Sequence, residues 1–400
     1  MATTFSDFDS GPTRSFAAED VSIDTRTLKP GDLFVALNGE SRDGHRFVQT
    51  AFERGAAAAL VSQRPDNLSE EASLLLVANT QRGLEDLGCG ARARAQGKVI
   101  AVTGSAGKTT SKEMLRLAFG ALGQTHASAS SYNNHWGVPL SLAQFPRESR
   151  FGVFEIGMNH FGEIRRLVDF VQPHAAIVTT VAPAHLEYFG SLEAIADAKS
   201  EIFEGLQPDG AAIIPVENPC TERLIARARQ ASVERILTFG QTAADARILS
   251  ITDLNRGMRV ETEILGKRHV FAIGAAGMHI AHNALATLLA ATEPTAGGRR
   301  IAVLGDMLEL GPESAALHAD LASAIEEARA DLVFACGRDM RALYEALPPS
   351  RRGSWGATSS EIAPALVRAL RAGDEVLIKG SLGSCMAVIL DALKAGGGSA

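Results

Sequence analysis

The sequence predicts an α/β protein made of three consecutive α/β domains. Short apolar runs alternate with helix-length segments along most of the chain. In the middle of the chain these runs are continuously apolar, which is typical of parallel strands covered on both faces. The 400 residues correspond to about two to three domains of usual size, and a hydrophobic content of 46% suffices for several cores.

The first domain is expected over residues 1–97. Residues 1–20 carry little pattern, and a turn signal at 29–31 separates the first two strands. Strands are expected at 21–24, 32–37, 57–61 and 74–77, and helices at 45–54 and within 82–97. This pattern describes a small α/β unit.

The second and third domains continue the alternation. The central domain is expected over residues 98–296 with a mainly parallel sheet, and a polar hinge near Ala296 separates it from a C-terminal domain at 297–400. Strands are expected at 99–102, 152–156, 175–181, 211–215, 301–304, 332–335 and 376–378, and a helix at 192–203.

The most specific motif is a glycine-rich loop after the first central strand, Gly104-Ser105-Ala106-Gly107-Lys108-Thr109-Thr110. Glycines let backbone N–H groups surround an anion, and the N-terminus of the following helix adds partial positive charge. Lys108 supplies a full charge, and Thr109 supplies a hydroxyl for magnesium. Val102 stands where the strict Walker pattern has its first glycine, so the prediction of a P-loop depends on the strand–loop–helix setting. The alternative is a glycine-rich turn with a chance lysine.

Composition argues against several classes of protein. A net charge of −7 without a Lys/Arg cluster argues against a nucleic-acid partner. No run of about 18 apolar residues occurs, so we expect no membrane insertion. The cysteines are scattered without a Cys-x-x-Cys pair, which argues against zinc and disulfides and favours the cytoplasm. They are Cys89, Cys220, Cys336 and Cys385. We expect a monomer.

Two residues at or after predicted strands are candidates for chemistry. Glu155 lies in the strand at 152–156, where a carboxylate is costly to bury without a cation. His185 follows the strand at 175–181, and open α/β sheets bind ligands at the carboxyl ends of their strands. Lys199 lies in a helical segment, and only the family resemblance given below makes it a candidate. Taken alone, each also fits a structural interpretation, as a solvated acid, a loop histidine and a solvated lysine.

Longer motifs are shared with a known family. The central ones lie at 103–110, 132–140, 155–158, 183–187 and 198–203, followed by His279 and Asn283 in a His-x-x-x-Asn pattern and by a motif at 302–311. Near the N-terminus the motifs lie at 22–26, 30–37 and 43–45. Together they resemble the ATP-dependent Mur ligases, from about Val21 to the C-terminus.

The resemblance implies ATP and two magnesium ions as cofactors. The catalytic residues it implies are Lys108, Lys199, His185 and Glu155. The metal ligands it implies are Thr109, Glu155, His185 and Lys199, with the lysine carried as a carbamate. The nucleotide-binding residues it implies are Gly104, Ser105, Ala106, Gly107, Lys108, Thr109, Thr110, Asn133, Asn134 and Asn283. For the uridine diphosphate end of a second substrate it implies Thr25, Arg26, Asp43, Gly44 and His45.

The motif at 302–311 resembles one branch of the family. That branch implies addition of D-alanyl-D-alanine to UDP-N-acetylmuramoyl-tripeptide in peptidoglycan precursor synthesis. ATP would phosphorylate the terminal carboxylate of the tripeptide, and the dipeptide amine would attack the resulting acyl phosphate. The third residue of the tripeptide, diaminopimelate or lysine, stays open.

One departure from the family pattern is expected to matter. Only residues 284–300 separate Asn283 from Ile301, and the family's Asp-x-Tyr-Asn-Ala-Asn-Pro segment is missing. We therefore expect a Rossmann-like C-terminal domain that lacks its first strand and helix and exposes an unpaired sheet edge. Two alternatives follow: an inactive nucleotide-binding homologue, and a sibling ligase with another amino-acid acceptor.

Overall fold

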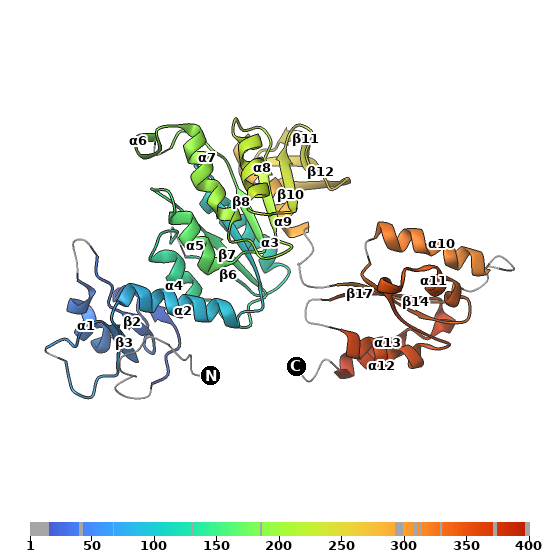
Figure 1. The fold of residues 1–400 in the computed structure, drawn as a ribbon, viewed down its shortest axis with the longest axis horizontal. Helices are drawn as coiled ribbons and strands as arrows, with labels where there is room; N and C mark the ends of the chain where they lie inside the picture. The colour runs from blue at the N-terminus through green and yellow to red at the C-terminus, as the bar shows by residue number, and fades with distance from the viewer. Residues whose placement is uncertain are drawn as a thin grey trace. The chain divides into compact units, whose positions relative to one another are not determined.

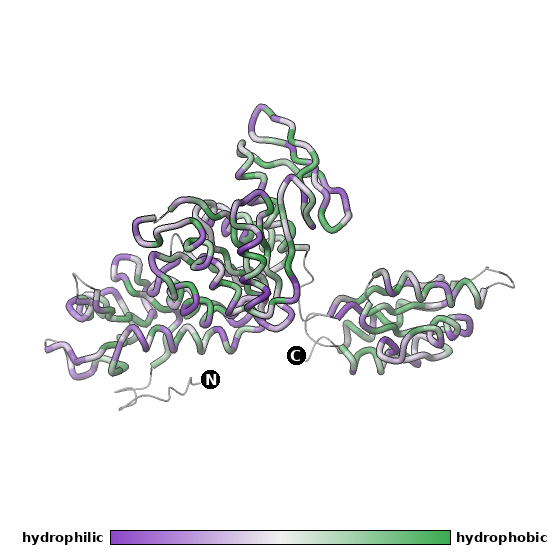
Figure 2. Tube along the Cα trace, turned by 45° about the horizontal axis from the view of Figure 1, so that its top comes forward, coloured by the Kyte–Doolittle hydropathy of each residue, from purple (hydrophilic) through white to green (hydrophobic). Residues whose placement is uncertain are grey.

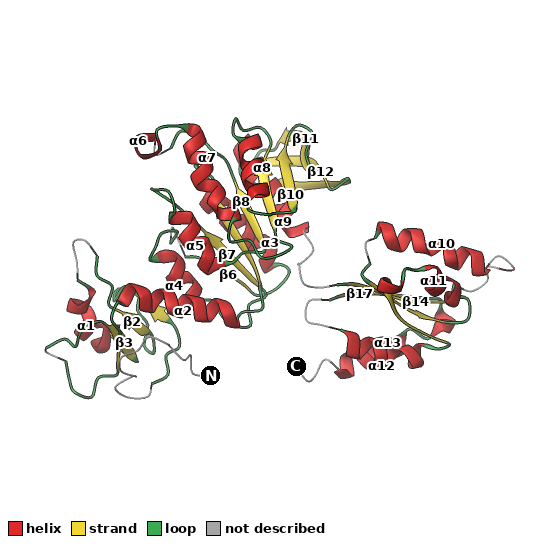
Figure 3. Ribbon diagram, viewed as in Figure 1, coloured by secondary structure: helices red, strands yellow, loops and turns green. Residues whose placement is uncertain are grey.

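The computed structural model forms two compact units, Met1–Glu293 and Pro294–Ala400 (Figure 1). It describes residues 16–39, 43–66, 68–129, 132–184, 186–292, 299–307, 311, 314–328, 330–370 and 374–396. Both units mix helices with strands, which confirms the predicted α/β class (Figure 3). Every helix among the described residues is too short or too polar to span a bilayer.

The first unit begins with a small parallel sheet in the order β1-β2-β3-β4. Its strands are β1 (Val21–Ser22), β2 (Leu33–Val35), β3 (Ala58–Val61) and β4 (Leu74–Leu76). Its helices are η1 (Gly44–Phe47), α1 (Val48–Glu53) and α2 (Thr80–Arg94). Asn79 begins α2, because its side chain accepts a hydrogen bond from Arg82 N. The sheet places α1 on one face and α2 on the other.

A second, larger sheet has nine strands in the order β13-β12-β11-β10-β9-β8-β5-β7-β6. Its strands are β5 (Lys98–Thr103), β6 (Thr125–Ala127), β7 (Phe151–Glu155), β8 (Ala175–Val178), β9 (Ala211–Pro215), β10 (Arg235–Gly240), β11 (Ala246–Asp253), β12 (Met258–Ile264) and β13 (Lys267–Ile273). From β6 to β11 neighbouring strands are parallel, and β11, β12 and β13 pair antiparallel. The predicted mainly parallel central sheet is therefore confirmed.

Helices cover both faces of this sheet. One face packs under α3 (Lys108–Gly120) and α9 (Met278–Thr292). The other packs under α4 (Gly137–Ala143), α5 (Glu163–Val171), α7 (Leu192–Ser200) and α8 (Thr221–Gln230), with the short α6 (Leu186–Phe189) and η2 (Glu201–Phe203) at the ends of α7. Figure 2 shows hydrophobic segments alternating with hydrophilic ones along the chain trace. The central strands β5, β7, β8 and β9 are buried over nearly their whole lengths, as double-sided cover requires.

The sequence did not predict β6, β10 to β13, or β16 (Arg352–Gly356). The strands β11 to β13 extend beyond the doubly covered part of the sheet, and β13 is largely exposed. They therefore lack the continuous apolar run of the covered strands. Strand β16 reads Arg-Gly-Ser-Trp-Gly and has an apolar residue only at Trp355.

The two sheets of the first unit are joined through helices. Helix α4 contributes Leu140 to the core of the small sheet and Val138 to that of the large sheet. Gly88 of α2 lies close to α4, because a Cβ there would be 2.9 Å from the Pro139 carbonyl oxygen. Residues expected as two domains, divided between 97 and 98, thus keep separate sheets but pack as one unit.

Polar contacts strengthen the same junction. Val171 and Gln172 form the end of α5. Arg92 of α2 is buried and donates hydrogen bonds to their carbonyl oxygens, at 2.7 and 2.8 Å. Glu85 of α2 pairs with Arg166 of α5 at 2.6 Å. Helix α2 therefore belongs to the core of the small sheet and is tied by polar contacts to α5, which covers the large sheet.

The second unit is a three-layer α/β structure with the parallel sheet β16-β15-β14-β17. Its other strands are β14 (Arg300–Gly305), β15 (Leu332–Cys336) and β17 (Glu375–Lys379). One face packs under α10 (Ser314–Glu327) and α11 (Met340–Ala346), and the other under α12 (Ser359–Ala369) and α13 (Ala387–Gly396). Short 3-10 turns η4 (Pro349–Arg351) and η5 (Leu382–Ser384) connect these elements. The expected boundary between 296 and 297 lies outside the described residues.

Candidate active site

The glycine-rich loop connects β5 to α3 at the carboxyl end of the large sheet. Gly107 precedes α3 with φ of 83°, a left-handed conformation that glycine adopts without steric cost. A Cβ on Gly104 would collide with the Thr179 hydroxyl. Helix α3 starts at Lys108. The N–H groups of its first turn therefore have no partner within the helix and can bind an anion.

The end of β8 holds this loop in shape. Ser105 donates from its backbone N to the Thr180 carbonyl at 2.8 Å and from its hydroxyl to the Ala182 carbonyl at 3.0 Å. The Thr179 hydroxyl donates to the Ala106 carbonyl at 2.5 Å. Our sequence interpretation overlooked Thr179, whose only signal was its place immediately after a buried strand.

Lys108 lies across the loop. Its Nζ donates to the Gly104 carbonyl oxygen at 2.8 Å. Burial lowers the pKa of Lys108, and the charge of Glu155 opposes this shift. A cation is thus held at the loop, beside the first turn of α3.

The side chain of Glu155 contacts Thr109 and Asn133 beside the loop. These contacts fit a single site made by the three residues. Glu155 ends β7 and is 1% exposed. Its Oε2 accepts a hydrogen bond from the Thr109 hydroxyl at 2.8 Å, and its Oε1 accepts one from Asn133 Nδ2 at 2.7 Å. Three residues far apart in the sequence therefore present a carboxylate, a hydroxyl and an amide at one point.

The other two asparagines have different surroundings. Asn283 of α9 is buried against the loop, since a Cβ on Gly107 would be 2.9 Å from its Nδ2. The Asn134 side chain accepts hydrogen bonds from Trp136 N at 3.1 Å and Gly137 N at 2.9 Å. Asn134 therefore organises the start of α4, and its side-chain oxygen already has these two donors.

Lys199 is buried inside α7, with 3% of its surface exposed. Burial, and secondly the charge of Lys108, lower the pKa of Lys199 to about 7. Much of this amine is therefore neutral near neutral pH. The solvated-lysine interpretation of Lys199 is wrong, because the side chain is enclosed by the core beneath α7.

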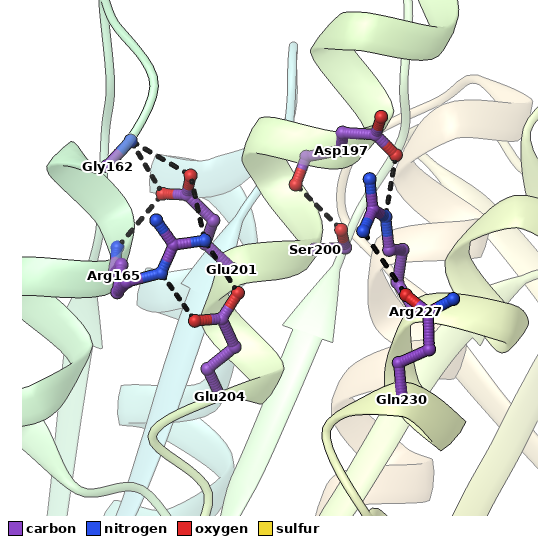
Figure 4. Close-up of polar contacts among 8 residues, drawn as sticks. All are labelled: Gly162, Arg165, Asp197, Ser200, Glu201, Glu204, Arg227 and Gln230. Carbon is purple, nitrogen blue, oxygen red and sulfur yellow. Dashed lines mark hydrogen bonds and ion pairs between the residues drawn. The ribbon is translucent and has the colours of Figure 1, made fainter.

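Two polar clusters hold the helix that carries Lys199 (Figure 4). Asp197 accepts hydrogen bonds from Arg223 and Arg227 of α8, at 2.7 and 2.9 Å. Arg223, followed by Arg227, depresses the pKa of Asp197 far below its ordinary value. This cluster ties α7 to α8.

The second cluster ties the end of α7 to α5. The Glu201 carboxylate accepts hydrogen bonds from the backbone N of Gly162 at 2.9 Å and of Arg165 at 3.1 Å, and so caps α5. The Arg165 guanidinium pairs with Glu204. Asp197 and Glu201 stand two residues before and after Lys199, which places them on the opposite side of the helical turn. That spacing was a signal in the sequence that we did not use.

A separate hollow opens over the small sheet. Its lining contains the predicted Thr25, Arg26 and Gly44. Ile23, Asp24, Phe34 and Leu37 come from the N-terminal motifs at 22–26 and 30–37, and Tyr132 and Trp136 come from the motif at 132–140, whereas Gly39 and Phe47 lie outside these motifs. Arg26 is held by Asp24 through hydrogen bonds of 3.0 and 2.6 Å. The hollow thus combines aromatic side chains with an exposed guanidinium.

Asp43 and His45 do not line this hollow. His45 is buried, its Nδ1 lies 2.7 Å from Asp43 Oδ1, and its Nε2 accepts a hydrogen bond from Ser62 N at 2.9 Å. Both ring nitrogens are therefore occupied within the protein. The pair stabilises the turn beside the hollow, and Gly44 between them is its lining residue.

His185 lies outside the described residues. Within the part of the chain that the structure describes, no group of three or more His, Cys, Asp or Glu residues is arranged to hold a metal ion.

Comparison with known proteins identifies the family. Residues 18–115 match the Mur ligase family catalytic domain, residues 102–291 the Mur ligase middle domain, and residues 258–382 the glutamate ligase domain of Mur ligases. The UDP-N-acetylmuramoyl-tripeptide–D-alanyl-D-alanine ligase of Escherichia coli (strain K12) is 33% identical over 434 positions, covering 94% of either chain. The ligase of the same name from Bacillus subtilis (strain 168) is 32% identical over 80% of either chain.

A solved structure agrees in fold. The crystal structure of MurF from Acinetobacter baumannii superposes with a TM-score of 0.63, at 29% identity over 94% of each chain. The alignment with the Escherichia coli enzyme spans more positions than this chain has residues, so that enzyme contains residues with no counterpart here. The matched domains and the relative that is 33% identical over 94% of its length lead to one conclusion: the chain belongs to the Mur ligase family.

Proposed function

We propose that this chain is an ATP-dependent ligase that joins D-alanyl-D-alanine to UDP-N-acetylmuramoyl-tripeptide, in peptidoglycan precursor synthesis in the cytoplasm. The observation that carries the proposal is the contact between Thr109 and the buried Glu155 beside the phosphate loop. It brings together the groups that a phosphoryl transfer needs, and the relatives compared above bear the name of this activity.

ATP would bind with its phosphates at the start of α3. The N–H groups of the loop and the first helical turn, together with Lys108, would hold the β- and γ-phosphates. Lys108 would leave the Gly104 carbonyl for a phosphate oxygen, which is the stronger, charge-assisted partner. Asn283 would fix Gly107 beneath these phosphates.

The residues present fit magnesium. Glu155 is a buried carboxylate whose neighbours at 2.8 and 2.7 Å are a hydroxyl and an amide, and magnesium prefers oxygen ligands of this kind combined with phosphates and water. Thr109 and Glu155 would hold a first ion. Lys199 as a carbamate, together with His185, would hold a second. The ions would supply positive charge for the transferring phosphoryl group.

Lys199 is suited to become a carbamate. Only a neutral amine adds to carbon dioxide, and the lowered pKa of about 7 leaves such an amine available. The addition forms an N–C bond, releases one proton and turns a potential cation into an anion. The clusters around Asp197 and Glu201 would hold the helix so that this anion stays beside the loop.

The reaction would proceed in two steps. The terminal carboxylate oxygen of the tripeptide attacks the γ-phosphorus, which releases ADP and gives an acyl phosphate. The amine of D-alanyl-D-alanine then attacks the acyl carbon, which releases phosphate and forms the amide. Lys108 stabilises the charge that develops in the first step, and the remaining contribution of the chain is positioning.

The hollow over the small sheet would hold the uridine diphosphate end of the acceptor. Its aromatic residues, Phe47, Tyr132 and Trp136, suit the uracil ring, and Arg26 suits a diphosphate. Tyr132 immediately precedes Asn133, so one short segment contributes to both the hollow and the phosphate site.

The test is ADP release with each substrate omitted in turn. We expect strong release only when ATP, the nucleotide-linked tripeptide and D-alanyl-D-alanine are all present, and a drop of at least about a hundredfold in Lys108→Ala. Replacing the dipeptide by single amino acids separates a sibling ligase from this one. Undiminished release by Lys108→Ala would refute the proposed phosphate site.

A second candidate is an inactive homologue that binds nucleotides. It is favoured by the residues that this chain lacks relative to the Escherichia coli enzyme. Such a protein would gain thermal stability with ATP or with the uridine nucleotide, by mass action, and release no ADP with all substrates present.

A further inference from the structure

A buried lysine beside the phosphate loop has no part in the reaction proposed above. Lys112 lies one turn after Lys108 in α3, and only 1% of it is exposed. Its Nζ donates to the Ser128 carbonyl oxygen at 2.8 Å and pairs with Glu113 Oε1 at 3.0 Å. Burying an ammonium costs free energy, and apolar residues of similar volume often stabilise a fold as well or better. The fold alone therefore does not require a lysine at this position.

The partner of this lysine lies against the strand that carries Glu155. Ser128 follows β6 directly, and its backbone N donates to the Val153 carbonyl oxygen at 3.1 Å. Its hydroxyl accepts a hydrogen bond from Glu155 N at 3.4 Å. Further along the chain, the Asn133 carbonyl accepts from Gly157 N at 2.8 Å, and Asn133 Nδ2 donates to the Glu155 carboxylate at 2.7 Å. Ser128 and Asn133 together contact the chain before, at and after Glu155.

Helix α3 reaches Glu155 by two routes. Thr109 and Lys112 are three residues apart, so they lie on the same side of the helix. Thr109 donates directly to Glu155 Oε2 at 2.8 Å. Lys112 acts through Ser128, because it holds the carbonyl of the residue whose hydroxyl accepts from Glu155 N. A shift of Ser128 away from α3 would therefore move Glu155 relative to Thr109.

We propose that Lys112 is a positioning residue for the magnesium site: through Ser128 it holds the Glu155 carboxylate beside the Thr109 hydroxyl, where the two would bind one ion. The inference rests on the proposed function, because it concerns the same phosphate site. It requires no contact of Lys112 with phosphate or with the ion. Loss of a group that orients a metal ligand typically lowers metal affinity or activity by about 10- to 100-fold.

Calorimetric titration with a non-hydrolysable ATP analogue tests the proposal without turnover. In the unmodified chain we expect magnesium to strengthen binding of the analogue relative to binding in EDTA. Lys112→Met keeps the length of the side chain and removes its charge. In this variant the strengthening by magnesium should fall by about tenfold or more, whereas the affinity in EDTA should be unchanged. That result would show an intact phosphate loop with a weakened ion site.

Arg116→Met is the matched control. Arg116 lies one turn further along α3 and pairs with the other oxygen of Glu113, at 2.8 Å, but its side chain is 48% exposed. The same substitution there also takes a cation from Glu113, and it should leave the effect of magnesium unchanged. An equal change in both variants would overturn the proposal, because charge around α3 in general would then be responsible. So would an unaltered effect of magnesium in Lys112→Met.

Ser128→Ala tests the second contact of the same route. It removes the hydroxyl that accepts from Glu155 N and leaves the carbonyl for Lys112. Its effect should have the same sign as that of Lys112→Met. The double variant should lose less than the sum of the two single losses, since both changes break one chain of contacts. Strictly additive losses would refute the route through Ser128.

Circular dichroism and thermal melting check that each variant is folded. If Lys112→Met does not fold, Ser128→Ala still decides the question. A magnesium effect that Ser128→Ala leaves intact would then overturn the proposal.

ADP release separates this inference from the proposed function. With all substrates present, Lys112→Met should lower kcat by about tenfold or more and leave the KM for the uridine-linked tripeptide unchanged, because the hollow over the small sheet holds that end of the substrate. If the unmodified chain binds the analogue with magnesium but never releases ADP, the proposed function fails and the titrations still decide on Lys112. If magnesium does not strengthen binding to the unmodified chain, the inference fails whether or not ADP is released.

Discussion

At the scale of single residues, burial lowers the pKa of one ionisable group at each end of the large sheet, with different consequences. At the carboxyl end, burial, and secondly the charge of Lys108, lower the pKa of Lys199 to about 7. At the amino end, His174 accepts a hydrogen bond from Val99 N at 3.0 Å, and burial, with Lys98 and Arg92 nearby, lowers its pKa to about 4. The first group is available for chemistry, whereas the second is fixed in its neutral form.

Lys199→Ala is expected to lose nearly all ADP release. If Lys199 acts as a carbamate, a short carboxylic acid such as acetate should restore part of the activity, because it supplies the missing anion. The matched control is Lys112→Ala, in which a buried lysine of α3 that donates to the Ser128 carbonyl is removed, and acetate should give no recovery there. Full activity of Lys199→Ala would exclude the carbamate role.

His174 should make stability depend on pH between about 6.5 and 4. In this range the unfolded chain binds a proton at His174 and the folded chain, with its pKa of about 4, does not. Stability is therefore complete above the ordinary pKa and decreases as the pH falls towards 4, by up to about 3 kcal/mol from this residue. In His174→Gln the side-chain oxygen can still accept from Val99 N, and denaturant unfolding should lose this part of the pH dependence. If the stability of His174→Gln depended on pH as that of the unmodified chain does, this role of His174 would be contradicted.

At the scale of elements, the function of α7 depends on how neighbouring helices hold it. Helix α8 holds it through Asp197, and α5 through Glu201. Helix α5 is in turn held by Arg92 of α2. Helix α5 therefore contacts both α2, which packs on the small sheet, and the end of α7, the helix that carries Lys199.

The contact of α2 with α4 can be tested with two glycine-to-alanine substitutions. Gly88→Ala puts a Cβ 2.9 Å from the Pro139 carbonyl oxygen, so the helices must separate, and we expect a loss of about 1–3 kcal/mol. Gly120→Ala, at the end of α3, has no atom within 4 Å of the new Cβ and should be neutral or gain up to about 1 kcal/mol from helix propensity. Thermal melting compares them, and equal midpoints would show that α2 and α4 are not closely packed.

At the scale of the whole molecule, the contacts divide the chain into two compact units, Met1–Glu293 and Pro294–Ala400, and the first of them contains two separate sheets. Helix α4 contributes to the cores of both sheets, and the buried Arg92 of α2 donates to the end of α5 across the junction. The C-terminal unit has cores of its own on both faces of its sheet. We therefore expect the first two sheets to unfold together.

Calorimetry should show two thermal transitions for the full chain. Arg92→Met leaves the carbonyl groups of Val171 and Gln172 without their donor and should destabilise only the unit Met1–Glu293, by about 1–3 kcal/mol. Arg116→Met removes an exposed ion pair with Glu113 in the same unit and should change stability by less than about 1 kcal/mol. A separate transition of the small sheet in the unmodified chain would contradict the shared core.

Much of the fold could be predicted from the sequence, because buried parallel strands appear as continuous apolar runs. The predicted strands at 99–102 and 211–215 match β5 and β9 to within a residue. The missed strands are the edge strands β6 and β16, the parallel strand β10, and the strands β11 to β13, which pair with one another antiparallel. Their sequences alternate or are polar, and only their pairing partners make them strands.

For the site, the sequence by itself determined the residue types and their local setting. A glycine-rich turn between a buried strand and a helix is able to bind an anion, since backbone conformation and the helix N-terminus are local properties. The tertiary structure alone decided which distant residues meet there. It brought Glu155 to Thr109, enclosed Lys199 so that its pKa fell, and gave Asn134 and His45 structural partners instead. Burial and pairing depend on the whole packed chain, so no local pattern contains them.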